Sequence, residues 1–357
     1  MAKFHNIKVF DIYKVTKDCS VVTFQSPDEL ITEFQYHQGQ HLTLKTIIEG
    51  EDVRRSYSLC SSPVENKWQV AVKKINGGLF STFVNENLKK GDFIEIMPPS
   101  GKFNVEINPE NAKNYIAFAA GSGITPVLSI IKTHLALEPN STFKLFYLNR
   151  SVKSIIFKEE IEQLKNRYFG RFEIFHFLTK EQRFSELFNG RFTKEKIQVL
   201  TNKIIDVKNT DDCFICGPED MIFLLRDELV AAGLDQDKIH YELFTSGISE
   251  ADKERIKRIV EHKAEGTDVT IIDGGKEFHF VMDEAYDNIL DGALAAGADL
   301  PFACKGGVCS TCKCKVIEGE VEMKVNYALD AHEVAKGLVL SCQAVPTTDK
   351  VVVDFGF

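Results

Sequence analysis

The chain has 357 residues, 44% of them hydrophobic, which suits two or three domains with buried cores and excludes a disordered chain. Its formal net charge of -9 argues against nucleic acid as a partner. No apolar run reaches the roughly 18 residues of a membrane span, and the N-terminus lacks an apolar segment behind a basic start, so neither membrane insertion nor export is indicated. We therefore expect the nine cysteines to stay reduced, in the cytoplasm.

Residues 1–105 consist of short β segments separated by turn signals, a pattern that predicts an antiparallel β-barrel. Within it, Arg55 and Tyr57 fall on one face of a strand, because strand side chains alternate. On that face the guanidinium of Arg55 can bind a phosphate and the ring of Tyr57 can stack on a planar heterocycle. Ser58 would add a hydroxyl near a ring nitrogen. An ordinary barrel strand explains the same residues, so this motif alone does not establish a flavin site.

Residues 73–82 form the second candidate motif of this region. A glycine pair precedes Ser-Thr and an amphipathic run, which is typical of a loop that enters a helix, and helix N-termini bind phosphate. A simple helix start is the alternative. Because both motifs occur in this order upstream of a dinucleotide motif, we interpret residues 1–105 as a flavin-binding domain. The candidate cofactor contacts in this loop are Lys73, Gly78, Ser81 and Thr82.

An apolar strand at residues 115–120 runs into Gly121 and Gly123 and then into helical spacing. The glycines let the backbone approach a pyrophosphate, and the helix start directs its N–H groups there. Pro126 stands where the usual motif has a third glycine, so this is not the ordinary Rossmann fingerprint, although proline is accepted in a first helical turn. Strands and helices then alternate, with a less regular stretch to about Lys208, and predict a mostly parallel sheet in an α/β domain at residues 106–247.

Two further places in this domain are candidate nicotinamide contacts. Arg150 and Ser151 follow the second strand, where an arginine accommodates a 2′-phosphate, so they favour NADPH; a solvated loop arginine is the alternative. Cys216 ends a strand, at the edge where open α/β sheets bind ligands, and its thiol is placed to pack beside the nicotinamide. A buried structural cysteine is the alternative there, and it fits Cys213 better.

Residues 248–266 are strongly charged with mixed sign, and we interpret them as a linker that is helical in part, or else as a solvated surface helix. Both interpretations place a domain boundary there. Residues 267–357 begin with a hairpin, whose two-residue turn is Gly274-Gly275, followed by a short helix, a cysteine-rich loop and a β-rich end. This order predicts a small α+β domain.

Four cysteines in this last domain have the spacing of plant-type [2Fe–2S] ligands. Three lie in one tight loop at a C-x4-C-x2-C spacing and the fourth lies on a separate element, as expected for two irons that need four thiolates. A zinc site or a group of buried thiols is the alternative, but zinc motifs usually pair C-x2-C with a second such pair or with histidines. We therefore predict a cluster held by Cys304, Cys309, Cys312 and Cys342.

The residues around the cysteine loop add two expectations. Gly306 and Gly307 are expected to adopt the positive φ values that let backbone N–H groups point at sulfur. Cys314, on the outgoing strand, is expected to face away from the cluster and to serve packing alone.

Three short motifs at these expected cofactor sites resemble the ferredoxin–NADP reductase superfamily. They are Arg55-x-Tyr57-Ser58, residues 121–126 and Cys216-Gly217-Pro218. Residues 267–357 resemble a plant-type ferredoxin fused behind the reductase, so the resemblance covers essentially the whole chain. The segments 319–329 and 339–343 resemble, more specifically, the reductase subunits of ring-1,2-phenylacetyl-CoA epoxidases.

The resemblance implies FAD, NADPH and a [2Fe–2S] cluster as cofactors, a β-grasp fold for the ferredoxin domain, and a multisubunit di-iron oxygenase as electron acceptor. FMN is the alternative flavin in this family, and the loop Gly77-Gly78-x-x-Ser81 favours FAD. By position it implies that Arg55 binds flavin phosphate, that Tyr57 stacks on the isoalloxazine and that Ser58 approaches its N5. Thr125 and Cys216 would flank the nicotinamide. The catalytic candidates are Tyr57, Ser58 and Cys216, and the remaining cofactor contacts are Gly121, Gly123, Pro126, Arg150, Ser151, Gly217 and Pro218.

The number of electrons that each cofactor transfers at a time sets the order in which the three cofactors act. A nicotinamide gives two electrons as a hydride, a [2Fe–2S] cluster takes one at a time, and a flavin does both, so it belongs between them. We predict transfer from NADPH through FAD and the cluster to an oxygenase, with Lys305, Val308 and Ser310 on the docking face. The alternatives are a reductase for another aromatic-ring hydroxylating or monooxygenase system, a non-catalytic redox sensor and a zinc-stabilised binding module.

Overall fold

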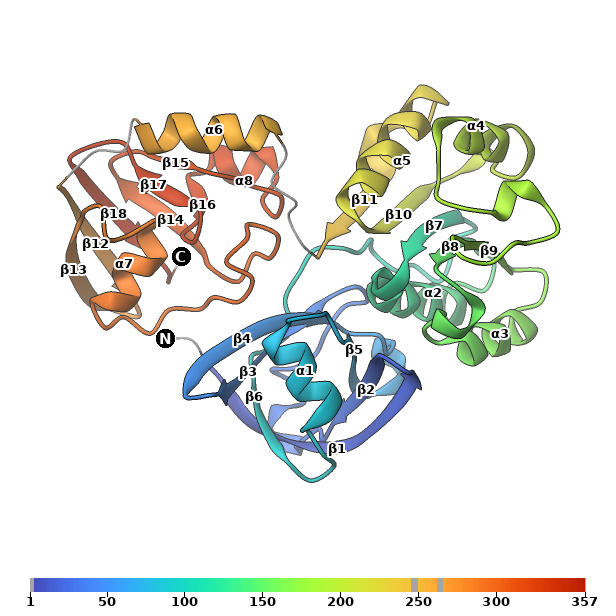
Figure 1. Ribbon diagram of the computed structural model, residues 1–357, viewed down its shortest axis with the longest axis horizontal. Helices are drawn as coiled ribbons and strands as arrows, with labels where there is room; N and C mark the ends of the chain where they lie inside the picture. The colour runs from blue at the N-terminus through green and yellow to red at the C-terminus, as the bar shows by residue number, and fades with distance from the viewer. Residues whose placement is uncertain (1–2, 245–249, 262–265, 357) are drawn as a thin grey trace. The chain divides into compact units, whose positions relative to one another are not determined.

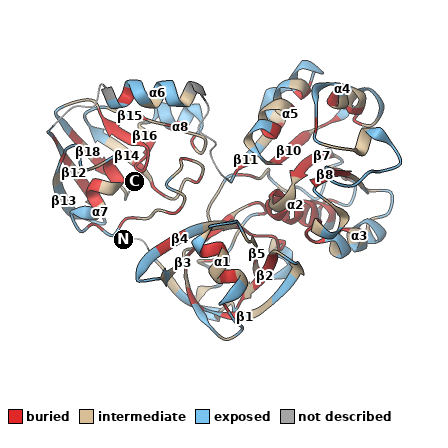
Figure 2. Cartoon of the chain, in the orientation of Figure 1, coloured by how far each residue is buried: buried red, intermediate tan, exposed pale blue. Residues whose placement is uncertain are grey.

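The computed structural model describes residues 3–244, 250–261 and 266–356 (Figure 1). The described chain forms two compact units, one built mostly from residues 6–244 and the other from the remaining C-terminal part. Each unit has its own buried interior, and the buried residues follow its strands and the inner faces of its helices (Figure 2). Within the described residues, no helix is both long and apolar enough to cross a membrane.

The first part of the chain forms a six-stranded sheet in the order β4-β3-β6-β1-β2-β5. The pairs β1–β2, β2–β5 and β3–β6 are antiparallel, and the β-branched strand β2 is buried almost throughout because it has partners on both sides. The predicted antiparallel flavin-domain fold is confirmed. Its elements are β1 His5–Thr16, β2 Cys19–Phe24, β3 His41–Ile48, β4 Glu51–Ser58, β5 Trp68–Lys73, α1 Leu79–Glu86 and β6 Phe93–Ile96.

The next part forms a five-stranded parallel sheet in the order β11-β10-β7-β8-β9, as predicted. The chain runs outward from β7 to β9 and then returns to β10, so the order reverses between β7 and β10. In open α/β sheets, ligands bind at the carboxyl ends of strands at such a reversal. The elements are β7 Asn114–Ala120, α2 Ile124–Leu137, β8 Thr142–Asn149, α3 Lys158–Arg167, β9 Phe172–Leu178, α4 Lys194–Lys203, β10 Asp212–Gly217, α5 Glu219–Ala231 and β11 Ile239–Leu243.

One stretch of this domain is more regular than its sequence indicates. The segment before Lys208 was expected to be irregular, but it contains the helix α4. Thr193 caps that helix, because its hydroxyl accepts a hydrogen bond from the backbone N–H of Lys196 at 3.4 Å. Ile197 and Leu200 are its buried residues, and such a short apolar stripe in a charged segment gives a weak helical signal.

The C-terminal unit contains a five-stranded sheet in the order β13-β12-β18-β14-β16 and a small sheet of β15 and β17. The predicted hairpin is confirmed: β12 and β13 pair antiparallel, and its turn residues Gly274 and Gly275 have φ values of 57° and 81°. The elements are β12 Thr267–Asp273, β13 Lys276–Met282, α7 Ile289–Ala295, β14 Lys313–Glu318, β15 Val321–Met323, α8 Ala331–Ala335, β16 Leu338–Leu340, β17 Ala344–Pro346 and β18 Lys350–Asp354.

The predicted charged linker is helical in part, as expected: α6 spans Glu250–Glu261. Residues 248–249 and 262–265 of the predicted linker lie outside the described residues. The helix packs within the C-terminal unit, where Ile259 is 1% exposed and the Tyr327 hydroxyl donates to Oδ2 of Asp252 at 2.7 Å (Figure 1). This charged helix therefore has one side that packs against the same unit as the cysteine loop.

Candidate functional site

Strand β4 presents the first set of predicted residues. The Tyr57 ring lies 5.7 Å from the Phe80 ring of α1, tilted by 38°, and it is partly exposed. Arg55 is exposed, and its guanidinium donates to the backbone carbonyl of Arg54 at 2.7 Å. Ser58 ends the strand and is buried. The strand therefore offers a partly exposed ring and a cationic side chain at alternate positions, as its sequence indicates.

The loop before α1 is shaped by its own glycine and serine. The Ser81 hydroxyl accepts from the N–H of Ile75 at 3.1 Å and donates to the carbonyl of Gly78 at 3.2 Å. A Cβ on Gly78 would lie 2.6 Å from that hydroxyl, so only glycine fits there. Ser81 thus holds the loop in shape from a buried position, while Gly78 caps the helix and Thr82 lies partly buried in its first turn.

The glycine turn after β7 packs directly against β10. A Cβ on Gly123 would lie 2.2 Å from the carbonyl oxygen of Cys216, so glycine permits a contact that any side chain would prevent. Gly121 has a φ of 54°, and a Cβ there would lie 3.8 Å from Nζ of Lys73. The predicted lysine of the flavin domain therefore stands beside the predicted nicotinamide loop.

The first turn of α2 completes this loop. The Thr125 hydroxyl donates to the carbonyl of Ser122 at 3.0 Å, and Pro126 lies buried in the first helical turn, where no backbone N–H is needed. The hydroxyl of Tyr147, on β8, donates to the carbonyl of Gly121 at 3.0 Å and holds the turn from below. The helix start is thus fixed by hydrogen bonds from the turn and from the sheet.

The carboxyl ends of three strands bring together Ser58, Cys216 and Glu242. In the parallel sheet, Cys216 of β10 is in register with Glu242 of β11. The Ser58 hydroxyl donates to Oε2 of Glu242 at 3.0 Å, so β4 meets β11 beside the cysteine. Glu242 was not among the predicted site residues; its only sequence signal is an acid near the end of the last parallel strand.

Burial sets the protonation of this group. It raises the pKa of Glu242 to about 7, with the Ser58 hydrogen bond acting in the opposite direction. Burial also raises the pKa of the Cys216 thiol well above its usual value, and the carboxylate of Glu242 adds to that effect. The thiol is therefore neutral near pH 7, whereas the carboxyl group titrates there.

The remaining predicted nicotinamide contacts lie at the same edge of the sheet. Arg150 is exposed after β8, and its carbonyl accepts from the N–H of Lys180 at 2.8 Å. The Ser154 hydroxyl accepts from the backbone N–H of Ser151 at 3.0 Å and donates to the Ser151 carbonyl at 2.8 Å, so Ser151 is held through its backbone. Gly217 ends β10, and Pro218 is the cap residue of α5.

In the C-terminal unit, the four predicted thiols form two pairs. Sγ of Cys309 lies 3.1 Å from Sγ of Cys304, and Cys312 and Cys342 are close enough for each thiol to shift the pKa of the other. The N–H of Gly306 donates to Sγ of Cys304 at 3.3 Å. The hydrogen bond from Cys309 lowers the pKa of Cys304 to about 5, and backbone N–H groups add to this.

The backbone of the cysteine loop differs from expectation at one position. Gly307 has a φ of 74°, as predicted, but the second positive φ belongs to Lys305, at 50°, and not to Gly306. Lys305 is held in place by an ion pair with Asp291 at 2.8 Å, which helps a non-glycine residue to keep this conformation. Cys314 is fully buried in the core, which agrees with a packing role.

Three sequence families match consecutive parts of the chain. The "Oxidoreductase FAD-binding domain" matches residues 6–105, the "Oxidoreductase NAD-binding domain" residues 118–227, and the "2Fe-2S iron-sulfur cluster binding domain" residues 271–347. Over 355 residues, 99% of this chain and 98% of the relative, the chain is 42% identical to one of the subunits of the "1,2-phenylacetyl-CoA epoxidase" of Escherichia coli (strain K12).

The chain belongs to the ferredoxin–NADP reductase superfamily, in the group with a fused C-terminal [2Fe–2S] ferredoxin. This reductase is also 32% identical, over 98% of its length and 96% of the relative, to "3-ketosteroid-9-alpha-monooxygenase, ferredoxin reductase component" of Rhodococcus rhodochrous. The structure of phthalate dioxygenase reductase shares its fold, with a TM-score of 0.60 and 23% identity over 99% of this chain and 98% of that one. The predicted three-module architecture and its FAD, nicotinamide and [2Fe–2S] cofactors are confirmed.

The thiol arrangement of the reductase fits a binuclear cluster. Among the described residues, no group of three or more His, Cys, Asp or Glu side chains is close enough to hold a metal ion. The two irons of a [2Fe–2S] cluster each take two thiolates from the protein. Two thiol pairs, with a backbone N–H directed at one sulfur, suit this arrangement.

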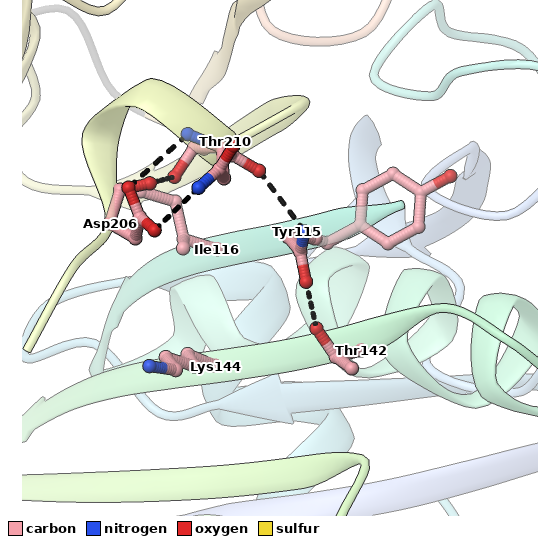
Figure 3. A pocket seen from close by; sticks show the side chains of 8 residues that line it. Tyr115, Ile116, Thr142, Lys144, Asp206 and Thr210 are labelled. Carbon is pink, nitrogen blue, oxygen red and sulfur yellow. Dashed lines mark hydrogen bonds between the residues drawn. The ribbon is translucent and has the colours of Figure 1, made fainter. Parts of the chain in front are cut away.

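A polar depression at the opposite edge of the parallel sheet is unrelated to this site (Figure 3). It lies where β7 and β8 begin, whereas the predicted contacts lie where those strands end. Asp206 is already used there, since its carboxylate accepts from Asn209 at 2.7 Å and its carbonyl from Thr210 at 2.8 Å. The lining residues are Asn114, Tyr115, Ile116, Thr142, Lys144, Asp206, Asn209 and Thr210.

Proposed function

We propose that this reductase takes a hydride from NADPH and delivers its electrons singly to a multisubunit di-iron oxygenase that epoxidises the ring of phenylacetyl-CoA, in the cytoplasm. The support for this acceptor is the 42% identity, over 99% of the chain, to a protein named as part of a phenylacetyl-CoA epoxidase. The 32% identical relatives named for a 3-ketosteroid monooxygenase supply the competing proposal, a reductase for another oxygenase. All nine cysteines are free thiols, which suits a reducing compartment.

The observation that carries the reductase function is the meeting of Ser58, Cys216 and Glu242. One residue comes from the flavin domain and two come from the nicotinamide domain. The reacting rings of the flavin and the nicotinamide are therefore proposed to meet beside these three residues. When bound, the nicotinamide supplies a hydride, the flavin converts it to single electrons, and the cluster carries one electron at a time.

The roles of the flavin-domain residues follow from their positions. We assign the Tyr57 ring to stacking on the isoalloxazine and Arg55 to the flavin phosphates, for which its guanidinium is a fork-shaped donor. The start of α1, shaped by Gly78 and Ser81, adds backbone N–H groups for phosphate. Lys73 adds a positive charge beside the nicotinamide loop.

Ser58 and Glu242 together can hold a proton at the reacting place. The serine hydroxyl is oriented by its hydrogen bond to Oε2 of Glu242, and the carboxyl group has a pKa of about 7. The pair can therefore gain or lose a proton near neutral pH, which is the range in which a general acid or base works best. Cys216 stays neutral and packs beside them.

On the nicotinamide side, we assign the turn at Gly121 and Gly123, with Thr125, to the pyrophosphate and nicotinamide ends of the cofactor. Arg150 is assigned to the 2′-phosphate, because it is exposed directly after the second strand.

Replacement of Arg150 by aspartate tests this assignment. In Arg150→Asp, the ratio of kcat/KM for NADPH to kcat/KM for NADH should fall at least tenfold. The matched charge reversal Lys165→Asp, on α3, should leave the ratio unchanged.

In the cluster domain, we assign one iron to the pair Cys304 and Cys309 and the other to Cys312 and Cys342. Lys305, Val308 and Ser310 are then on the proposed docking face for the acceptor. Of these, Lys305 is exposed and ion-paired with Asp291, and the other two are partly exposed.

The acceptor is tested by reconstitution. The purified reductase is combined with a multisubunit di-iron oxygenase and phenylacetyl-CoA, and NADPH consumption and epoxide formation are measured. In parallel, it is combined with an aromatic-ring hydroxylating oxygenase and that enzyme's own substrate. Product in the first reaction and not in the second supports the proposal. Product in the second alone would replace the acceptor, and failure to reduce ferricyanide with NADPH would favour a redox sensor.

A further inference from the structure

A buried polar seam joins the flavin domain to the nicotinamide domain. On one side it consists of Ser129, Lys132 and Thr133, which form one face of α2. On the other side lies the segment 60–65, which follows β4. The three α2 side chains are 0%, 7% and 1% exposed. Charged and polar residues this deeply buried must be paired, so their contacts define how the two surfaces fit.

Two hydroxyl contacts fix the seam at one end. The Ser129 hydroxyl donates to the backbone carbonyl of Ser61 at 2.6 Å. The Ser62 and Thr133 hydroxyls lie 2.8 Å apart, and the Thr133 hydroxyl also donates to the carbonyl of Ser129 at 2.6 Å. These hydrogen bonds are buried and directional, so a shift of the helix along the segment would break them together.

Lys132 fixes the other end. Its ammonium lies 3.3 Å from Oε2 of Glu65, donates to the carbonyl of Cys60 at 3.4 Å, and pairs closely with Glu160 of α3. Burial lowers the pKa of Lys132, but Glu160 and Glu65 outweigh that effect and raise it, so the side chain stays charged. One ammonium thus ties the flavin domain to two helices of the nicotinamide domain.

The seam lies a few residues from the reacting place on both sides. Ser129 follows Thr125 by four residues, or about one turn, in α2, the helix that begins at the nicotinamide loop. The segment 60–65 begins two residues after Ser58. Apolar contacts continue across the boundary, where the rings of Phe103 and Phe214 are 5.8 Å apart. A displacement of α2 relative to the segment 60–65 therefore also displaces the nicotinamide loop relative to strand β4.

We propose that Lys132, with Ser129 and Thr133, is a positioning residue for hydride transfer: it sets the register between the nicotinamide loop and the flavin-binding strand. The inference rests on the proposed function of the same site. Hydride transfer depends on the distance and alignment of two ring atoms, so small displacements reduce its rate without changing affinity for either cofactor. A residue with only a structural role would instead lower the FAD content or the melting temperature and leave the limiting rate constant of flavin reduction unchanged.

The experiment compares Lys132→Met with Lys144→Met in the full-length, FAD-loaded protein. Lys144 also forms an ion pair, with Glu173, but lies at the opposite edge of the sheet. Flavin reduction by NADPH and by 4-deuterated NADPH is followed under anaerobic conditions across NADPH concentrations. We expect Lys132→Met to lower the limiting rate constant at least tenfold and to change its isotope effect, with FAD content and NADPH dissociation constant within twofold. Lys144→Met should match the wild type.

A readout independent of activity is the thermal unfolding of the FAD-loaded protein in the absence of NADPH. We expect the flavin and nicotinamide domains to unfold in one transition in the wild type and in two in Lys132→Met. If Lys132→Met does not fold, Ser129→Ala and Thr133→Val take its place with the same expected outcomes. An unchanged limiting rate constant in a folded, FAD-replete variant overturns the inference. If NADPH does not reduce the flavin of the wild-type protein, the proposed function is overturned instead.

Discussion

The hydroxyl of Ser58 lies 3.0 Å from Oε2 of Glu242, which joins the last residue of β4 to a strand that follows 184 residues later. The flavin domain and the nicotinamide domain thus share a hydrogen bond beside Cys216, where both cofactors are proposed to react. Glu242 is partly buried, and desolvation of its carboxyl group raises the pKa to about 7. This contact makes the pH dependence of the protein a direct probe of the site.

Replacement of Glu242 by glutamine should remove part of that pH dependence. The folded pKa of about 7 exceeds the unfolded value of about 4.3, so the neutral carboxyl stabilises the fold fully below the unfolded pKa, and this contribution is lost as pH rises through 7. Glutamine keeps the size and cannot ionise. The melting temperature of Glu242→Gln minus that of the wild type should therefore increase from pH 5 to pH 8. A constant difference across this range would contradict the assigned pKa.

Cys216→Ala should slow flavin reduction by NADPH about tenfold, or about 1.4 kcal/mol of activation free energy, because the packing beside the nicotinamide is lost. Cys213→Ala is the matched control, since this thiol is also fully buried on β10 but lies at the start of the strand. It should lower the melting temperature without changing the rate constant. Equal rate constants in the two variants would remove Cys216 from the site.

The parts of the site that depend on local spacing were predictable from the sequence. Three of the four proposed ligand cysteines, the glycine turn at residues 121–123 and the Tyr57-Ser58 pair carry their signal within a few residues. Glu242 does not, because it reaches Ser58 only through the strand order of the sheet and the register of β10 with β11. A single acid on a short strand has no pattern that separates it from a solvated residue.

Two local expectations failed or were incomplete for different physical reasons. Positive φ was expected at Gly306 because glycine adopts it freely, yet Lys305 adopts it, with its side chain paired to Asp291 and lying over the Phe302 ring. The packing of α6 was not foreseen, since Ile256 and Ile259 form too short an apolar stripe among its charges. In both cases a tertiary contact decides the outcome.

Two cysteines of the ferredoxin unit separate ligation from packing. Cys342→Ala should abolish the visible absorption and the electron paramagnetic resonance signal of the cluster, because one iron loses a thiolate. Cys314→Ala should retain both and full iron content, since its thiol is buried in the core and burial raises its pKa. Loss of the cluster in Cys314→Ala at an unchanged melting temperature would reassign the ligands.

Helix α6 offers a test of its packing within the ferredoxin unit. Ile259→Asp places a charge at a position that is 1% exposed and should destabilise that unit by ~3 kcal/mol, seen as earlier thermal loss of cluster absorbance. Val260→Asp, one residue along and 53% exposed, should have no effect. Equal melting curves for the two variants would show that the helix is not part of the unit.

Electrons are proposed to pass from NADPH through the flavin to the cluster. Anaerobic stopped-flow absorbance of the full-length protein, mixed with NADPH, tests this order most directly. We expect the flavin absorbance to bleach first and the cluster bands to bleach within the same turnover. Reduction of the flavin while the cluster bands remain oxidised would contradict it.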